Sequence, residues 1–277
     1  MQPGIFAKTF PGSDPEAVLS AAVQAGFAAV QYNMACSGLP PMPDEITPEH
    51  IAGVVKARQV SGSTIVACSA TYNMIHPDQN VRELGHRRLE VIAAACAATG
   101  IDVMTLCTGT RDAEDQWRGH PDNQSKSAWT DLLKSMERAT EIAEKHNLTL
   151  GVEPELANVV NSANAARTLM NEMQSQRIGI ILDPANLFET ETLTQQRAIV
   201  SDAVAILGDR IIMGHAKDRR PDGSFTTAGQ GVLDYDHYLN TLRSTGFDGP
   251  LIAHGLDAKE APTVGRFLEQ CLKQGAA

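Results

Sequence analysis

The chain has 277 residues, of which 43% are hydrophobic and 20% are charged, so it is long enough to bury a large core. Its formal net charge of -10 disfavours a protein that grips nucleic-acid phosphates or binds an anionic membrane surface. Small anionic substrates stay compatible with this charge, because they need only one or two local cations.

Short apolar runs alternate along the chain with longer segments of helical period. The predicted strands cover residues 4–10, 28–33, 63–70, 102–109, 148–155, 177–185, 210–218 and 250–257. The predicted helices cover residues 13–27, 82–100, 127–147, 163–173, 195–207, 234–247 and 263–274. The first helix has Ser13 or Asp14 as its candidate cap, followed by Pro15, and the second ends in Gly100.

Strands that alternate with helices predict a parallel sheet of the α/β class. Eight such strands in one chain favour a single closed (β/α)8 TIM barrel, with eight parallel strands and outer helices, over an open doubly wound sheet. The sequence contains no Gly-rich dinucleotide fingerprint and no P-loop, which weakens the open-sheet alternative. We expect one domain over residues 1–277, with long loops at 71–80 and 108–125.

The cysteines and the N-terminus favour a cytoplasmic protein. The five cysteines are an odd number and show no close-pair spacing, which is typical of a reduced chain rather than a disulfide framework. The first ten residues lack the apolar run of a secretion signal. The longest apolar run, near residues 91–98, is too short to span a bilayer.

Four consecutive predicted strands end in side chains that can bind a metal: Glu153, Asp183, His215 and His254. Each alone has an ordinary explanation, as a solvated loop acid, a turn opener or a hydrogen-bonded histidine. In a (β/α)8 barrel, however, the C-terminal strand ends meet at one face, where chemistry takes place. The coincidence of four donors predicts one divalent ion, and mixed nitrogen and oxygen ligands suit Mn, Fe, Co or Zn better than Ca.

The segments "VEPE", "ILDPANL", "GHAKD" and "AGQGVLDYDHYLNTLRSTGFDGPLI" resemble the sugar phosphate isomerase/epimerase family, also called xylose-isomerase-like. The resemblance implies one divalent metal held by Glu, Asp, His and a second Glu at the ends of strands 5 to 8. These positions become Glu153, Asp183, His215 and position 254, which here is His254. A second departure is Asn186, where family members often carry a substrate-binding histidine.

Replacement of a glutamate by His254 has chemical consequences. Two carboxylates and a divalent ion sum to a charge of 0, whereas three carboxylates would give -1, so the ion is expected to be a stronger Lewis acid. An imidazole nitrogen bound to metal has no free lone pair, which disfavours a symmetrical exchange of one proton between two glutamates. By strand parity, Glu153 and Glu155 point the same way, as do His215 and Lys217. Either glutamate is a candidate base, and Lys217 a candidate for stabilising an oxyanion or for a structural salt bridge.

Other residues near the predicted barrel mouth are candidates for substrate binding. His76 and His120 lie on the two long loops, where each is either a proton shuttle or a loop-ordering residue. Gln230 lies between Gly229 and Gly231, at the expected rim of the barrel. The remaining candidates for hydroxyl or ring contacts are Asn73, Thr110, Arg111, Trp117, Asn158 and Asn186.

We therefore expect an isomerase or epimerase that acts on a sugar, polyol or keto-sugar through an enediolate, using a Glu base. Its cofactor is one divalent ion, with Mn²⁺ first and Mg²⁺, Co²⁺, Zn²⁺ or Fe²⁺ as alternatives. A metal-dependent lyase or dehydratase, including elimination from an oxidised glycoside, is the main alternative. An apurinic endonuclease is disfavoured by the acidic charge, and a non-catalytic sugar-binding barrel by the four donors. The resemblance also implies a homo-oligomer.

Overall fold

The computed structural model describes residues 1–274, and in this range eight parallel strands close into a barrel. Pairing of β1 with β10, in which Gln2 faces Pro250, closes the circle. This confirms the (β/α)8 prediction and places all eight strands within the predicted ranges or one or two residues from them. The barrel strands are β1 Gln2–Phe6, β2 Ala29–Tyr32, β3 Thr64–Ser69, β4 Val103–Cys107, β5 Thr149–Glu153, β6 Ile178–Leu182, β7 Ile211–Ala216 and β10 Pro250–Ala253.

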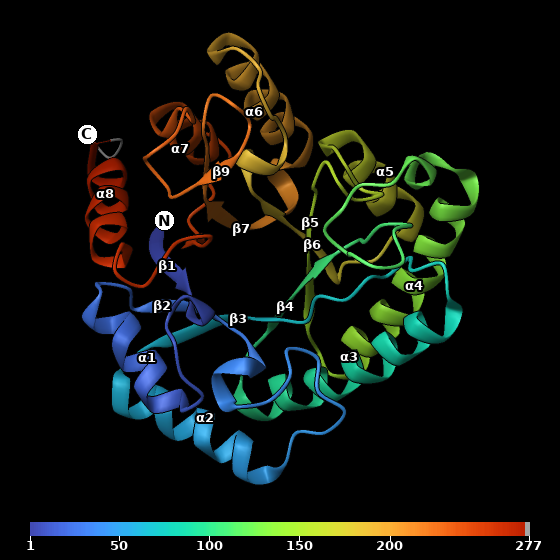
Figure 1. Ribbon diagram of the computed structural model, residues 1–277, viewed down its shortest axis with the longest axis vertical. Coiled ribbons are helices and arrows are strands. Elements are labelled where there is room, and N and C mark those ends of the chain that lie inside the picture. Colours follow the sequence, from blue (N-terminus) through green and yellow to red (C-terminus); the bar gives the residue numbers. More distant parts are fainter. Residues whose placement is uncertain (275–277) are drawn as a thin grey trace.

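The helices form a ring around the strands (Figure 1). Asp14 caps α1 by accepting from Glu16 N, and Gly100 ends α3 in the left-handed conformation, with a φ of 70°. Both ends agree with the cap residues read from the sequence. Within residues 1–274 the α-helices are α1 Pro15–Gln24, α2 Pro48–Ser61, α3 Gln79–Thr99, α4 Lys126–Lys145, α5 Ala163–Met173, α6 Leu193–Leu207, α7 Tyr235–Arg243 and α8 Ala261–Gln274.

Helix α2 lies outside the helices predicted from hydrophobic periodicity. Of its residues, Val54 and Ala57 are the buried ones, so its apolar stripe is too narrow to stand out. The signals at its ends were present in the sequence: Thr47 caps the helix, Pro48 occupies the first turn, and Gly62 ends it with a φ of 69°. Start and stop residues therefore predict this helix better than its hydrophobic pattern does.

A small apolar layer fills the barrel interior below the C-terminal strand ends. Ile181, Met213 and Ile252 are almost fully buried and pack in one cluster. Gly151 on β5 leaves room for this layer, since a Cβ there would lie 2.9 Å from Ile181 Cδ1. Each of these four residues lies two positions before a predicted metal ligand. Because side chains alternate along a strand, the ligands point into the barrel mouth directly above the apolar layer.

A short antiparallel hairpin follows β7 and covers one side of the barrel mouth. Its strands are β8 Asp218–Arg219 and β9 Phe225–Thr226. The buried Asp218 carboxylate accepts hydrogen bonds from the backbone N–H groups of Gly229, Gly231 and Leu233 at 2.9–3.1 Å. Asp218 therefore fixes the "AGQG" turn that the sequence analysis placed at the rim.

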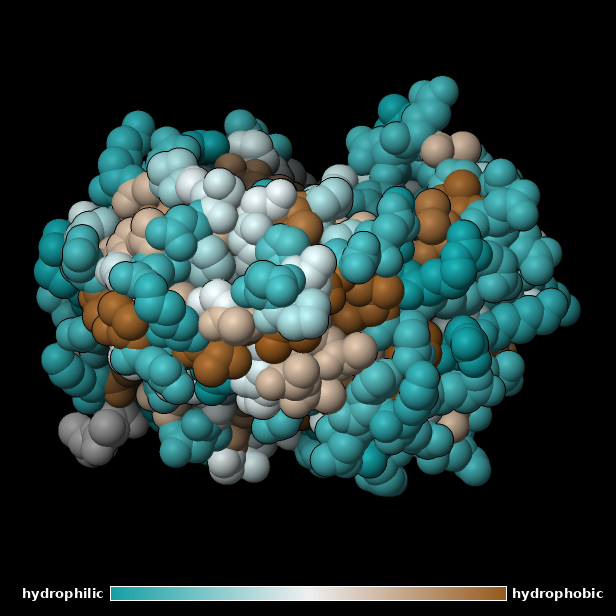
Figure 2. Space-filling view, turned by 90° about the horizontal axis from the view of Figure 1, so that it is seen from below, coloured by the Kyte–Doolittle hydropathy of each residue, from teal (hydrophilic) through white to brown (hydrophobic). Residues whose placement is uncertain are grey.

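The outer surface is mixed in character. On the face around α2, which is lowest in Figure 1, hydrophobic residues form a broken band between hydrophilic side chains (Figure 2). In the described part of the chain, no helix combines the length and apolar character needed to cross a membrane.

The apolar layer yields a stability prediction. Ile181→Ala should lower the free energy of unfolding by about 2–5 kcal/mol, because it opens a cavity beneath the strand ends. Val60→Ala is the matched control: Val60 is 57% exposed, and its truncation should change the free energy by less than about 0.5 kcal/mol. Urea unfolding followed by circular dichroism measures both, and equal losses in the two variants would contradict the layer's role.

Candidate active site and metal centre

Four potential ligands converge at the C-terminal ends of four consecutive barrel strands. Glu153 ends β5, Asp183 follows β6, His215 lies near the end of β7 and His254 follows β10. One ligand atom from each residue lies within 4.8 Å of the corresponding atoms of the other three. Glu153, Asp183 and His215 are buried, and His254 is partly exposed. The structure therefore brings together the complete set of ligands predicted from the sequence.

The four side chains form two carboxylate–imidazole pairs. His215 Nδ1 lies 3.2 Å from Glu153 Oε1, and His254 Nε2 lies 3.0 Å from Asp183 Oδ2. The centroids of the two imidazole rings are 4.5 Å apart, so the pairs lie side by side. Nitrogen and oxygen donors thus face one common region.

Lys217 and Asn186 link the two pairs. Lys217 Nζ is 3.3 Å from Asp183 Oδ2 and donates to Asn186 Oδ1 at 2.7 Å. Asn186 Nδ2 in turn donates to Glu153 Oε1 at 2.7 Å. The salt bridge of Lys217 is therefore formed with Asp183, whereas the adjacent Asp218 binds backbone N–H groups instead.

The protonation of the cluster follows from its charges. Burial alone would raise the pKa of Asp183, but Lys217 and His254 hold it well below its usual range. For His254, burial and the nearby charges of His215 and Lys217 lower the pKa, which favours the neutral ring that a metal ligand requires. For His215, burial is outweighed by Glu153, which raises the pKa. The two buried carboxylates therefore favour binding of a positive charge between them.

Glu155 lies just beyond β5 and lines the same cavity as Glu153. Burial, followed by the negative charge of Glu153, raises the pKa of Glu155 to about 7. Asn158 donates to Glu155 Oε2 at 3.1 Å, and its own Oδ1 accepts from Gly109 N at 2.6 Å. Asn158 is almost fully buried and therefore orients Glu155, although the sequence analysis considered it as a substrate contact.

Gln31 is a site residue that sequence reasoning missed. It is buried on β2, where its Oε1 lies 3.0 Å from His215 Nε2, and its Nε2 donates to Thr105 Oγ1 at 3.3 Å. A histidine that binds a metal through one nitrogen usually has its other nitrogen held in this way. The signal available in the sequence was a polar glutamine near the end of an otherwise apolar strand.

Glu153, His215 and His254 line a cavity of about 480 Å³ at the barrel mouth, and the almost fully buried Asp183 adjoins it through its contacts with His254 and Lys217. Trp117 from the loop after β4 reaches this cavity and is 52% exposed, so its ring is available to a ligand. Phe6, Lys8 and Phe225 also line it, and none of these three was identified from sequence. Gln230 lines a neighbouring cavity instead.

The two loop histidines lie outside the lining of this cavity and order their own loops. His76 Nε2 lies 3.0 Å from Ala113 O, and its Nδ1 accepts from the backbone of Asp78. His120 Nδ1 accepts from Asp122 N at 3.2 Å, at the start of a short 3-10 helix. These contacts agree with the loop-ordering alternative.

Three other candidates from the two long loops are also held by internal contacts. Asn73 Oδ1 accepts from Thr110 N at 3.0 Å, and the Thr110 hydroxyl is bonded to Asn123. Arg111 forms an ion pair with Asp131 at 2.8 Å. Asn73, Thr110 and Arg111 connect the loops to each other and to α4, and they do not line the cavity at the barrel mouth.

Solved structures share this fold over nearly their whole length. 3-Keto-D-glucoside 4-epimerase, YcjR, from E. coli is 16% identical with a TM-score of 0.77, covering 98% of this chain and 100% of that chain. A D-tagatose 3-epimerase-like protein is 16% identical with a TM-score of 0.78 and coverage of 100% and 98%. An IOLI protein with a binding zinc atom is 15% identical with a TM-score of 0.73 and coverage of 99% and 99%.

The comparison with curated protein sequences found no match. The model of the xylose isomerase-like TIM barrel family, in contrast, matches residues 19–270. This match covers most of the sequence and includes all four predicted ligands. The chain therefore belongs to the xylose isomerase-like TIM barrel family.

Proposed function

We propose that this protein is a divalent-metal-dependent isomerase or epimerase that acts on a small sugar, polyol or keto-sugar. The observation that carries the proposal is the convergence of Glu153, Asp183, His215 and His254 within 4.8 Å at the barrel mouth, where three of the four line the cavity. The sugar epimerases of the same fold described above support this reaction class.

The donor set fits a divalent ion. Glu153 and Asp183 supply two negative charges, and Lys217 alone does not balance both. His215 and His254 add nitrogen donors, a combination that suits Mn²⁺, Co²⁺, Zn²⁺ or Fe²⁺, with Mg²⁺ as a harder alternative. The IOLI structure of this fold has a zinc atom, which supports metal binding by the fold.

A divalent ion held by these four residues would supply Lewis-acid polarisation of substrate oxygens. We assign proton transfer to Glu155, because it lines the cavity and one of its oxygens has no hydrogen-bond partner within the described residues. Glu153 is already engaged by His215 and Asn186. Removal of a proton from the carbon next to a carbonyl places negative charge on oxygen, as an enediolate.

Lys217 is positioned to stabilise that developing charge. Its ammonium group lines the cavity and is oriented by Asp183 and Asn186. Fixed donors of this kind lower the barrier, since they need no reorganisation as charge develops on the oxygen. Asn158 would keep Glu155 in place during the transfer.

His254 bears on the choice among reaction types. With a histidine at this position, Glu155 is the carboxylate left for proton transfer, so a reaction with one base is favoured over exchange between two glutamates. Isomerisation with return of the proton by Glu155 satisfies this condition. Elimination by a lyase or dehydratase satisfies it too and is the second candidate function.

Metal binding is tested by loss of one ligand. His254→Ala should weaken Mn²⁺ binding by at least roughly tenfold while the far-ultraviolet circular dichroism stays unchanged, because His254 lies at the mouth and outside the core. His76→Ala is the control, since His76 does not line the cavity. Isothermal titration with Mn²⁺ measures both, and unaltered binding by the His254 variant would remove this residue from the ligand set.

The base is tested by proton exchange. Glu155→Gln should slow exchange of the carbon-bound proton of a ketohexose in heavy water by about 10²–10⁴-fold, with metal content retained, because it removes the accepting oxygen but no ligand. Glu137→Gln on the exposed face of α4 is the control. Proton NMR on D-fructose, D-tagatose and D-psicose gives the rates. Wild-type exchange rates in the Glu155 variant would exclude it as the base.

A further inference from the structure

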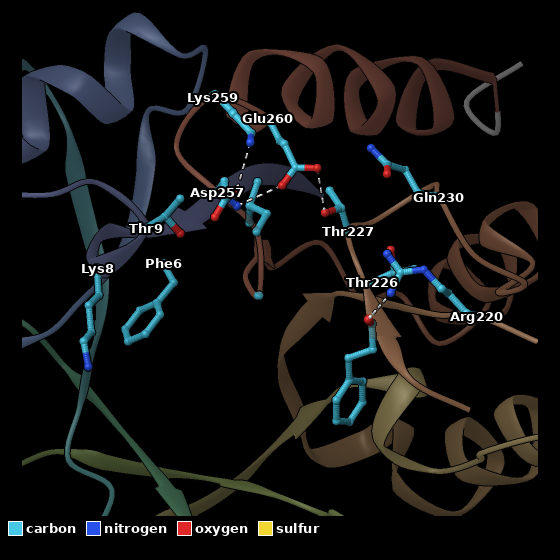
Figure 3. Close-up of a pocket in the computed structure, with 13 residues that line it drawn as sticks. Phe6, Lys8, Thr9, Arg220, Thr226, Thr227, Gln230, Asp257, Lys259 and Glu260 are labelled. Carbon is cyan, nitrogen blue, oxygen red and sulfur yellow. Dashed lines mark hydrogen bonds and ion pairs between the residues drawn. The ribbon is translucent and has the colours of Figure 1, made fainter. Parts of the chain in front are cut away.

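A second cavity of about 600 Å³ lies beside the one lined by Glu153, His215 and His254. Phe6, Lys8 and Phe225 line both cavities, so the two spaces adjoin. Figure 3 shows Phe6, Lys8 and Thr9 on one side of the second cavity and Thr226 and Thr227 on the opposite side. Both volumes fall within the roughly 300–1,000 Å³ of small-molecule sites. The combined volume of the two cavities is larger than one monosaccharide requires.

The polar groups of the second cavity suit a hydroxyl-rich, uncharged ligand. Glu260 accepts from the Thr227 hydroxyl at 3.1 Å and from Asp257 N at 2.9 Å (Figure 3). The Glu260 carboxylate has no ion-pair partner among the described residues and would repel a phosphate placed beside it, whereas Lys259 offsets the charge of Asp257. Thr9 and Gln230 add a hydroxyl and an amide, which can each donate to or accept from a sugar hydroxyl.

The cations of the cavity are largely engaged with the protein. Lys259 forms an ion pair with Asp257 at 3.3 Å, and Arg220 donates to the carbonyl of Phe225 at 3.1 Å. Lys8, Arg220 and Lys259 together with the carboxylates of Asp257 and Glu260 give the lining a formal charge of only +1. A lining this close to neutrality accommodates an uncharged polyol.

Aromatic rings mark the junction between the two cavities. Phe225 on β9 is 44% exposed, and Lys217 Nζ lies 3.8 Å from its ring centroid. The Arg219 guanidinium lies 4.0 Å from the same centroid and fixes the ring from the hairpin. Since Phe6 also lines both spaces, apolar ring surface lies where two linked sugar units would pass from one cavity to the other. The apolar face of a sugar ring packs well on such surfaces.

We propose that the second cavity binds a further sugar unit, so that the substrate is a glycoside of a keto-sugar with its reacting ring above the metal donors. This inference rests on the proposed function for the placement of the reacting ring. Phe6 and Phe225 contact the glycosidic junction, and Thr9, Gln230 and Glu260 contact hydroxyls of the second unit. The second cavity thereby determines specificity for two-ring over one-ring substrates.

The experiment compares matched one-ring and two-ring sugars on the Mn²⁺-loaded protein. The pairs are D-fructose with lactulose, which is fructose carrying a galactosyl unit, and 3-keto-D-glucose with 3-ketocellobiose. Titration calorimetry measures affinity, and exchange of carbon-bound protons in heavy water measures reaction. The wild-type protein should bind the two-ring member of at least one pair tenfold or more tightly than its one-ring partner.

Thr9→Trp fills the second cavity and should reduce that preference at least tenfold. Gln230→Ala serves as a second variant if Thr9→Trp does not fold, with a smaller reduction of the same sign. Thr190→Trp is the matched control, because Thr190 is exposed and lines a different groove. It should leave the preference for two rings unchanged.

The outcomes separate the two proposals. Equal affinity within both pairs, including undetectable binding of all four sugars, overturns the second-unit site. So does an unchanged preference in folded Thr9→Trp and in Gln230→Ala. Proton exchange from the one-ring sugars with no gain from a second ring overturns this inference and leaves the proposed function standing. Preferential binding of two-ring sugars without exchange from any sugar supports the site and contradicts the proposed function.

Discussion

Two carboxylates buried next to each other at the barrel mouth are the constraint on which the rest of the site depends. Glu153 and Asp183 each raise the energy of the other, and burial of an uncompensated charge costs several kcal/mol. The surrounding groups compensate this charge. His215 faces Glu153, whereas His254 and Lys217 face Asp183. Asn186 connects the two halves. A divalent ion at their centre would complete the compensation.

The fold supplies the geometry for this arrangement. Each ligand lies two residues beyond a position in the interior layer, so the packing of Ile181, Met213 and Ile252 sets the height at which the donors meet. The loops and the hairpin then supply groups that are not metal donors. Asn158 orients Glu155, and the β8–β9 hairpin brings Phe225 over Lys217. A rigid strand framework thus holds the donors, while loops and the hairpin shape the space around them.

The sequence predicted the barrel and the convergence of the donors, because strand parity and strand-end position are local properties that repeat in every β/α unit. It predicted less well the residues whose role depends on contacts distant in sequence. Gln31 reaches His215 across 184 positions, and Phe225 acts from a hairpin with no periodic signal. From the sequence, Asn73 and Arg111 on the long loops were candidates for substrate contacts. In the structure their side chains instead form contacts that fix these loops.

The most direct measurement of the central claim is a crystal structure of the Mn²⁺-soaked protein with anomalous diffraction recorded at the manganese edge. The account predicts one strong anomalous peak bonded to Glu153, Asp183, His215 and His254, at distances of about 2.0–2.3 Å typical of such ligands. Absence of a peak at saturating Mn²⁺, with the two carboxylate–imidazole pairs still hydrogen-bonded to each other, would contradict it.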